Sequence, residues 1–207
     1  MPVGAGSASL HAAAQPVADL DADPGLQIEL AAVLGTIDSL AVEQSLLGAL
    51  AATDDPSLKN WFVYAIGSRQ NWPRDDIFQG MKNPMMVQTP GGLQLMIDRP
   101  LKSERTRLQL YANYAEADDD LRLAIVKVLN HSDGFSDARG FMHQTLRDTQ
   151  EQRILNETGG ALGRWLSSHP AENEEASTIV TSLMARAAET DSVKLRLLLS
   201  HSLAEAR

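Results

Sequence analysis

The sequence contains no cysteine, few aromatic residues and no long run of apolar or basic residues. Without cysteine the chain can form no disulfide, no thiolate metal site and no cysteine nucleophile. Only 5% of its residues are aromatic, so we expect a hydrophobic core built mainly from Leu, Ala, Ile, Val and Met. No apolar run approaches the roughly 20 residues of a transmembrane helix, which predicts that the chain has no membrane span.

Positive charge is also scarce. The 207 residues include 18 Lys and Arg against 27 Asp and Glu, which gives a net charge of −9 at pH 7. Nucleic-acid binding requires clustered Lys and Arg side chains that contact phosphates. We therefore expect no nucleic-acid partner, and we expect any protein or peptide partner to be neutral or basic.

Sequence signatures of catalysis and metal binding are missing as well. No two of the five histidines lie three or four residues apart, so no helical pair of metal ligands exists. The sequence has no phosphate-binding glycine loop and no nucleophile elbow. We therefore expect no metal and no cofactor, and an enzyme is not favoured. Carboxylates that the fold alone brings together would leave no such signature. The histidines are His11, His131, His143, His169 and His201.

Residues 1–24 are rich in Ala, Gly, Ser and Pro and lack the basic start and apolar centre of a signal peptide. This composition predicts a flexible tail, followed by a single α-helical domain over residues 25–207. Both a linker and the trimmed end of an exported precursor have such a composition. The compartment is therefore left open, with the cytoplasm favoured over export of a mature form.

Helical periodicity begins near Leu26, with a first helix that Gly35 can end and a second that Asp38 can cap. The stretch DDPSLKNWFVYAI, residues 54–66, then predicts a further helix. Asp55 can cap its free amides, and Pro56 occupies a first-turn position where a missing N–H does no harm. Five apolar residues follow at i, i+3, i+4, i+7 and i+8, which is one buried stripe: Leu58, Trp61, Phe62, Ala65 and Ile66.

Two later segments begin in the same way. Asp118–Asp120 and Asp191 are acidic caps, and each is followed by an aliphatic residue and then a base. The three bases are 63 and 72 residues apart, about twice the length of a two-helix repeat. The aliphatic–base pairs are Leu58-Lys59, Leu121-Arg122 and Val193-Lys194, and the two later stripes are Leu121, Ala124, Ile125, Val128 and Leu129, and Leu195, Leu198, Leu199 and Leu203.

The openings DPSLK, DDDLR and TDSVK resemble the start of the second helix in HEAT-like repeats. In that family an Asp in the inter-helix turn and a Lys or Arg early in the second helix commonly hydrogen-bond between adjacent repeats. The resemblance covers about 40 residues directly. It implies an all-α, HEAT-like solenoid in which these bases bridge repeats, and an irregular helical bundle is the alternative.

One region departs from the helical pattern. Residues 86–97 contain two short apolar runs around the turn sequence Pro90-Gly91-Gly92, which predicts an inserted β-hairpin. Residues 71–82 before it are expected to form a loop and one short helix. Large apolar side chains concentrate here, and a Met-rich cluster can be an adaptable binding surface, although it is more often core. The candidate partner-binding residues are Trp72, Phe78, Met85, Met86 and Met96, together with Arg122.

These observations predict a non-catalytic scaffold that binds a protein or peptide on the concave face of the solenoid. A small all-α enzyme and a secreted helical effector are the alternatives. The sequence stops on an apolar helix, whereas solenoid ends usually carry a polar cap. We therefore expect the C-terminal helix to pack against further chain or a second copy, as in a fragment or a homo-oligomer.

Overall fold

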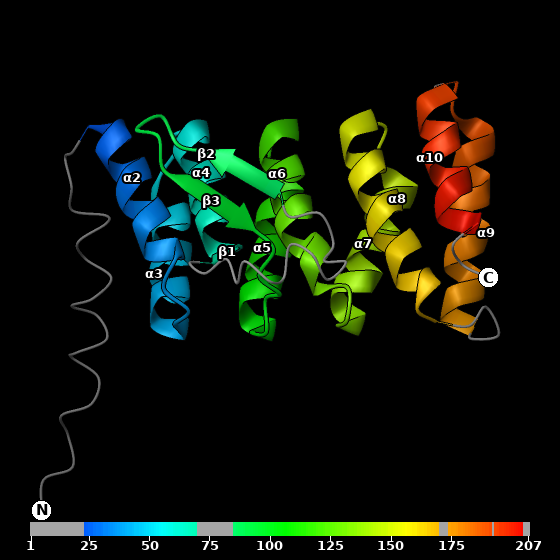
Figure 1. Cartoon of the computed structure of the whole chain (residues 1–207), viewed down its shortest axis with the longest axis horizontal. Helices are drawn as coiled ribbons and strands as arrows, with labels where there is room; N and C mark the ends of the chain where they lie inside the picture. The colour runs from blue at the N-terminus through cyan, green and yellow to red at the C-terminus, as the bar shows by residue number, and fades with distance from the viewer. Residues whose placement is uncertain (1–22, 70–84, 170–173, 192, 205–207) are drawn as a thin grey trace, which may run out of the picture. The chain divides into compact units, whose positions relative to one another are not determined.

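The computed structural model describes residues 23–69, 85–169, 174–191 and 193–204 (Figure 1). Over these ranges the protein is all-α with one small antiparallel sheet, as predicted. The predicted loop and short helix at residues 71–82 lie outside them. The helices are α2 (Pro24–Gly35), α3 (Leu40–Ala52), α4 (Pro56–Ile66), α5 (Glu104–Glu116), α6 (Asp119–Leu129), α7 (Ser136–Asp148), α8 (Gln152–Ser167), α9 (Glu174–Glu189) and α10 (Val193–Ala204).

The chain forms two compact units, residues 1–113 and 114–207. A single domain from residue 25 onward, and the flexible tail before it, stay predictions. No helix among the described residues is long and apolar enough to cross a membrane.

In the first unit, α4 follows the sequence pattern closely. The Asp55 carboxylate accepts hydrogen bonds from the amides of Ser57 and Leu58, at 2.8 and 3.2 Å, so the predicted cap is confirmed. Four of the five stripe residues are buried, whereas Trp61 is partly exposed. Val63 is buried as well, because α4 contacts both α2 and α3 and therefore has a wider buried face.

Gly35 ends α2 as expected, but the predicted cap of the next helix is wrong. The N-cap position of α3 is Ser39, whose side chain makes no capping bond. Asp38 lies one residue too early to cap, and its carboxylate instead lies 3.7 Å from the guanidinium of Arg99.

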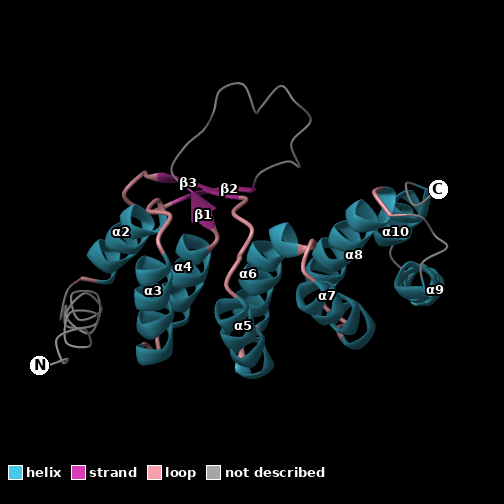
Figure 2. Cartoon of the chain, turned by 90° about the horizontal axis from the view of Figure 1, so that it is seen from below, coloured by secondary structure: helices cyan, strands magenta, loops and turns pink. Residues whose placement is uncertain are grey.

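The predicted hairpin is present and belongs to a sheet with the strand order β1-β3-β2 (Figure 2). Its strands are β2 (Met85–Gln88) and β3 (Gln94–Ile97), joined by a turn in which Gly92 has a φ of 95° that favours glycine. The unpredicted strand β1 (Ser68–Arg69) pairs antiparallel with β3. The side chains of β3 from Leu95 to Ile97 are buried, and β3 contacts α4. The sheet is therefore part of the core of this unit.

Close packing of α2 on α4 depends on the absence of a side chain at Gly35. A Cβ added there would lie 2.8 Å from Ala65 Cα and closer still to the Ala65 carbonyl oxygen, which is backbone and cannot yield. We expect Gly35→Ala to lower the free energy of unfolding by about 1 to 3 kcal/mol. Gly48 in α3 is the matched control, because nothing lies within 4 Å of an added Cβ there.

Gly48→Ala should raise the free energy of unfolding by about 0.5 to 1 kcal/mol through helix propensity alone. Urea denaturation of both variants measures the two effects. A neutral or stabilising Gly35→Ala substitution would contradict the close approach of α2 and α4.

In the second unit, the predicted α6 stripe is buried in full. Asp118 caps the helix by accepting a hydrogen bond from the Leu121 amide at 2.9 Å. Leu123 and Val126 are buried in addition to the stripe. Helix α8 contacts α6, α7 and α10, and α9 contacts α7 and α10 (Figure 1). The side chains of residues 194, 195, 198 and 199 lie outside the described part, so most of the predicted α10 stripe and its base stay untested.

Candidate protein-binding surface

Helix α2 is apolar on two opposite faces. One face consists of Ile28, Ala31, Ala32 and Gly35, all buried, and the helix contacts α4 and α3. Figure 1 shows α2 at the N-terminal edge of its unit, with α3 and α4 on one side. At 3.6 residues per turn, Leu26, Leu30 and Val33 lie on the opposite face, and Ile37 follows them just past the end of the helix.

These residues form what we call the α2 stripe: Leu26, Leu30, Val33 and Ile37. Their spacing of four, three and four residues places them on one line along the helix. Ile37 follows the last helical residue, in a turn where its amide still bonds to the Leu34 carbonyl at 2.9 Å. Leu26 is 56% exposed, Val33 50% and Ile37 44%, whereas Leu30 is only partly exposed, so the stripe is open to solvent at three of its four positions.

One charged residue borders the stripe, three positions after Leu26 and four before Val33. Glu29 is the only charged residue within α2, and its Oε1 accepts a hydrogen bond from the Gly91 amide at 2.6 Å. Glu29 is thereby held against the β2–β3 turn. The next carboxylates lie at the two ends: Asp23, which caps α2 by accepting from the Gly25 amide at 3.0 Å, and Asp38.

The sequence shows that this helix is apolar, but its periodicity does not distinguish the buried face from the exposed one. The sequence places Leu26, Ile28, Leu30 and Leu34 in one short apolar helix. A helix that is apolar all round must be covered on every side to be stable as core. The structure instead leaves one apolar face of α2 exposed.

The candidate partner-binding residues near the hairpin differ in their exposure to solvent. Trp72 and Phe78 lie outside the described residues. Met96 faces the core and is buried, although Met86 is its cross-strand partner. Met86 is 42% exposed and Met85 is partly exposed. Of the three hairpin methionines, Met85 and Met86 on β2 are therefore open to a partner and Met96 is not.

Arg122 links two consecutive helices. Its Nε donates to the Tyr114 carbonyl at 3.2 Å and its Nη2 to the Ala115 carbonyl at 3.4 Å, both in the last turn of α5. The guanidinium also lies over the Tyr114 ring, 5.4 Å from its centroid, and 3.7 Å from Asp119. Burial raises the Tyr114 pKa, so this ring stays a neutral phenol around pH 7. Arg122 thus has a structural bridging role in the fold.

A similar bridge joins α6 to α8, which the sequence reasoning missed. Arg153 Nη1 in the first turn of α8 lies 3.0 Å from Asp120 Oδ1 in the first turn of α6. Glu151 caps α8 by accepting from the Arg153 amide, and a hydrogen bond from the Arg153 side chain, followed by this backbone bond, lowers the Glu151 pKa. The signal was present but reversed in order, since the base precedes the aliphatic Ile154 instead of following one.

Polar contacts also join α7 to α9. Arg139 pairs with both carboxylate oxygens of Glu175 at 3.0 Å and lies over the Trp165 ring, 4.6 Å from its centroid. His143 Nε2 lies 2.6 Å from Ser182 Oγ. Burial lowers the His143 pKa, and the nearby charge of Arg147 lowers it further, so His143 is neutral at pH 7. These contacts hold helices together inside the unit.

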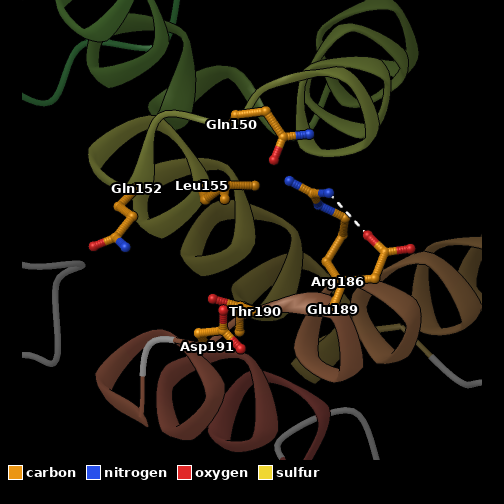
Figure 3. Close-up of a pocket in the computed structure, with 7 residues that line it drawn as sticks. All are labelled: Gln150, Gln152, Leu155, Arg186, Glu189, Thr190 and Asp191. Atoms are coloured by element: carbon orange, nitrogen blue, oxygen red, sulfur yellow. Dashed lines mark hydrogen bonds and ion pairs between the residues drawn. The ribbon is translucent and has the colours of Figure 1, made fainter.

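A polar pocket of about 290 Å³ lies between the start of α8 and the end of α9 (Figure 3). Arg186 occupies one wall, where it pairs with Glu189 at 2.9 Å and donates to the Thr149 carbonyl. Its guanidinium charge is thus balanced within the unit. The lining residues are Gln150, Gln152, Leu155, Arg186, Glu189, Thr190 and Asp191.

Among the described residues, no group of three or more His, Asp or Glu side chains is placed to hold a metal ion. No protein-family model matches the sequence, and no curated protein or solved structure matches it significantly.

Proposed function

We propose that this protein is a non-catalytic helical-repeat module that binds another protein through the α2 stripe. The observation that carries the proposal is the exposure of a continuous apolar line on a helix whose other face is already packed. Exposed apolar patches with polar rims mark interaction sites on soluble proteins. The geometry fits docking of an apolar helix face, which relies on side chains at i, i+4, i+7 and i+11.

The HEAT-like architecture is part of this proposal. Consecutive helices pack on one another in the pairs α3–α4, α7–α8 and α9–α10. The Arg153–Asp120 contact joins the first turns of α6 and α8, and an Asp–Arg bond is the type that the resemblance implies between adjacent repeats. Repeats of this kind offer extended binding surfaces without a catalytic centre. These contacts support the repeat interpretation.

An uncharged stripe also defines the chemistry of the partner. The partner's contact face is expected to be apolar and neutral at its centre, in keeping with the neutral or basic partner that the acidic chain favours. Among the described residues, basic groups on a partner could meet Glu29 beside the stripe and Asp23 and Asp38 at its ends.

Affinity capture from a lysate of the source cells tests this function with two matched variants. Val33→Asp places a charge in the stripe, and Leu108→Asp places one on α5 at a site of equal exposure, 50% against 53%. Proteins captured by the intact chain and by Leu108→Asp should be lost with Val33→Asp. Met86→Ser tests the hairpin in the same experiment.

Melting curves must first show that all three variants are folded. If Val33→Asp captures the same proteins as the intact chain, the stripe is not the binding surface. Loss with Met86→Ser alone would instead move the site to the β2 methionines.

A further inference from the structure

We infer that the partner of the α2 stripe is a cationic amphipathic helix, which places apolar side chains on the stripe and a Lys or Arg beside Glu29. This inference rests on the proposed function and names the kind of partner that the same surface binds. It is carried by the distribution of charge along the chain and by the backbone chemistry of α2.

The net charge of the chain is concentrated in the segment that contains α2. Residues 1–58 include no Lys or Arg and eight acidic residues, whereas the 18 bases and 19 acids of residues 59–207 nearly cancel. The first segment therefore carries −8 of the net charge of −9. A field of one sign attracts partners of the opposite sign and repels its own kind. This distribution favours a cationic partner and opposes both a second copy of the chain and an anionic membrane surface.

Three carboxylates of this segment lie at the α2 face. Asp23 and Asp38 lie at the ends of the stripe, and the side chain of Asp38 is 89% exposed. Glu29 borders the centre of the stripe. One of its oxygens accepts from the Gly91 amide, and the other has no hydrogen bond or ion pair among the described residues. Because Glu29 is partly exposed, its charge can pair with a Lys or Arg at the edge of a bound helix.

The backbone of α2 selects a helix as the structure of the partner. Within a helix the N–H and C=O groups bond to one another, so the middle of the stripe presents only side chains. An extended segment laid on it would bury unpaired backbone groups, whereas a helix satisfies its own. The exposed Leu26, Val33 and Ile37 form one line, and an amphipathic helix presents its apolar side chains in such a line.

Binding of model peptides to the intact chain tests both parts of the inference. Three peptides share one helical face of Leu and differ only in the flanking residues, which are Lys, Gln or Glu. A fourth peptide has the composition of the Lys peptide in a scrambled order that has no apolar face. At about 0.05 M salt, fluorescence anisotropy should show the Lys peptide binding at least about tenfold more tightly than each of the others. At about 0.5 M salt, its affinity should fall close to that of the Gln peptide, because salt screens exposed charges.

Two variants assign this binding to the α2 face. Glu29→Gln keeps an oxygen for the Gly91 amide but removes the charge, so it should weaken the Lys peptide about two- to fivefold and leave the Gln peptide unchanged. Val33→Ser removes apolar contact area at a half-exposed site, so it should weaken both peptides by at least about fivefold. The matched controls are Glu174→Gln, at an exposed carboxylate on α9, and Leu108→Ser on α5, and neither should change the binding.

The outcomes separate the inference from the function on which it rests. Equal binding of the Lys and Glu peptides would overturn a cationic partner, and equal binding of the scrambled peptide would overturn an amphipathic helix. Binding of the Lys peptide that neither variant weakens would place the cationic site elsewhere on the chain. In each case Val33-dependent capture from the lysate would still support the proposed function. If no peptide binds and no protein is captured through Val33, both the inference and the proposed function are wrong.

Discussion

Replacing Arg99 by Met is expected to lower the free energy of unfolding by about 3 to 5 kcal/mol. Arg99 and Glu43 are both buried, at 8% exposure each, with 3.5 Å between Arg99 Nη2 and Glu43 Oε2. The same Nη2 donates to the Ile66 carbonyl at the end of α4, at 2.7 Å. Removing the guanidinium leaves a buried carboxylate whose other partner is the Thr106 hydroxyl, together with a carbonyl that loses its donor.

The second substitution tests whether the loss comes from the unpaired charge. In the double variant Glu43→Leu with Arg99→Met, both charges are replaced by apolar groups of similar size. We expect it to recover at least half of the stability lost by Arg99→Met, because replacing both members of a buried pair is often close to neutral. Urea denaturation of the two single variants and the double variant gives the coupling energy between the side chains.

The Arg153–Asp120 pair is the control. Its atoms are closer, at 3.0 Å, but its side chains are 54% and 68% exposed. Arg153→Met should therefore cause a much smaller loss, since solvent screens exposed pairs. If Arg99→Met is as mild as Arg153→Met, the Arg99 site is hydrated in solution and the Arg99–Glu43 pair is not buried there.

Local signals explain what could be predicted from the sequence. Asp55 and Asp118 are close in sequence to the amides that they cap, so a pattern of a few residues was enough to place both helix starts. The hairpin was predictable for the same reason, because its turn residues lie between its own strands. The apolar period likewise fixed the buried faces of α4 and α6.

Contacts between distant residues explain what could not be predicted. Strand β1 is two residues long and is a strand only because it pairs with β3, so Ser68 and Arg69 carry no signal of their own. Arg99 reaches Glu43 across 56 positions. Glu43 did give a partial signal, since it precedes Leu46 and Leu47 by three and four residues on the buried face of α3. A carboxylate in that position requires a buried partner, but the sequence does not say which.

The exposed face of α2 also could not be predicted from the sequence. Periodicity identified the apolar residues of α2, but apolar character does not reveal which face a neighbour covers. That required the positions of α3 and α4, which cover Ile28 and Ala32 and leave Val33 open. The hairpin methionines show the converse, because Met86 and Met96 are equally apolar cross-strand partners, yet Met96 lies on the central strand β3 and is buried whereas Met86 lies on the edge strand β2 and is exposed.

Truncation of Ile125 to Ala is expected to lower the free energy of unfolding by about 2 to 5 kcal/mol. Ile125 lies in the middle of α6 and is fully buried, between the equally buried Ala124 and Val126. The loss combines the removed apolar surface with the cavity left behind, so Ile125→Val, which removes one methylene group, should cost only about 0.5 to 1.5 kcal/mol.

Leu108→Ala is the control for truncating an aliphatic side chain at an exposed position. Leu108 is 53% exposed on α5, so its truncation should change the free energy of unfolding by no more than about 0.5 kcal/mol. Urea denaturation should show a lower midpoint for the Ile125 variants with an unchanged slope. An Ile125→Ala loss within the range of Leu108→Ala would remove Ile125 from the core. Because the stripe from Leu121 to Leu129 repeats the α4 offsets in full and is buried in full, such a result would also withdraw the strongest sequence support for a repeated two-helix unit. A graded loss across Val and Ala would instead show that the apolar period of α6 identifies the packed face in solution.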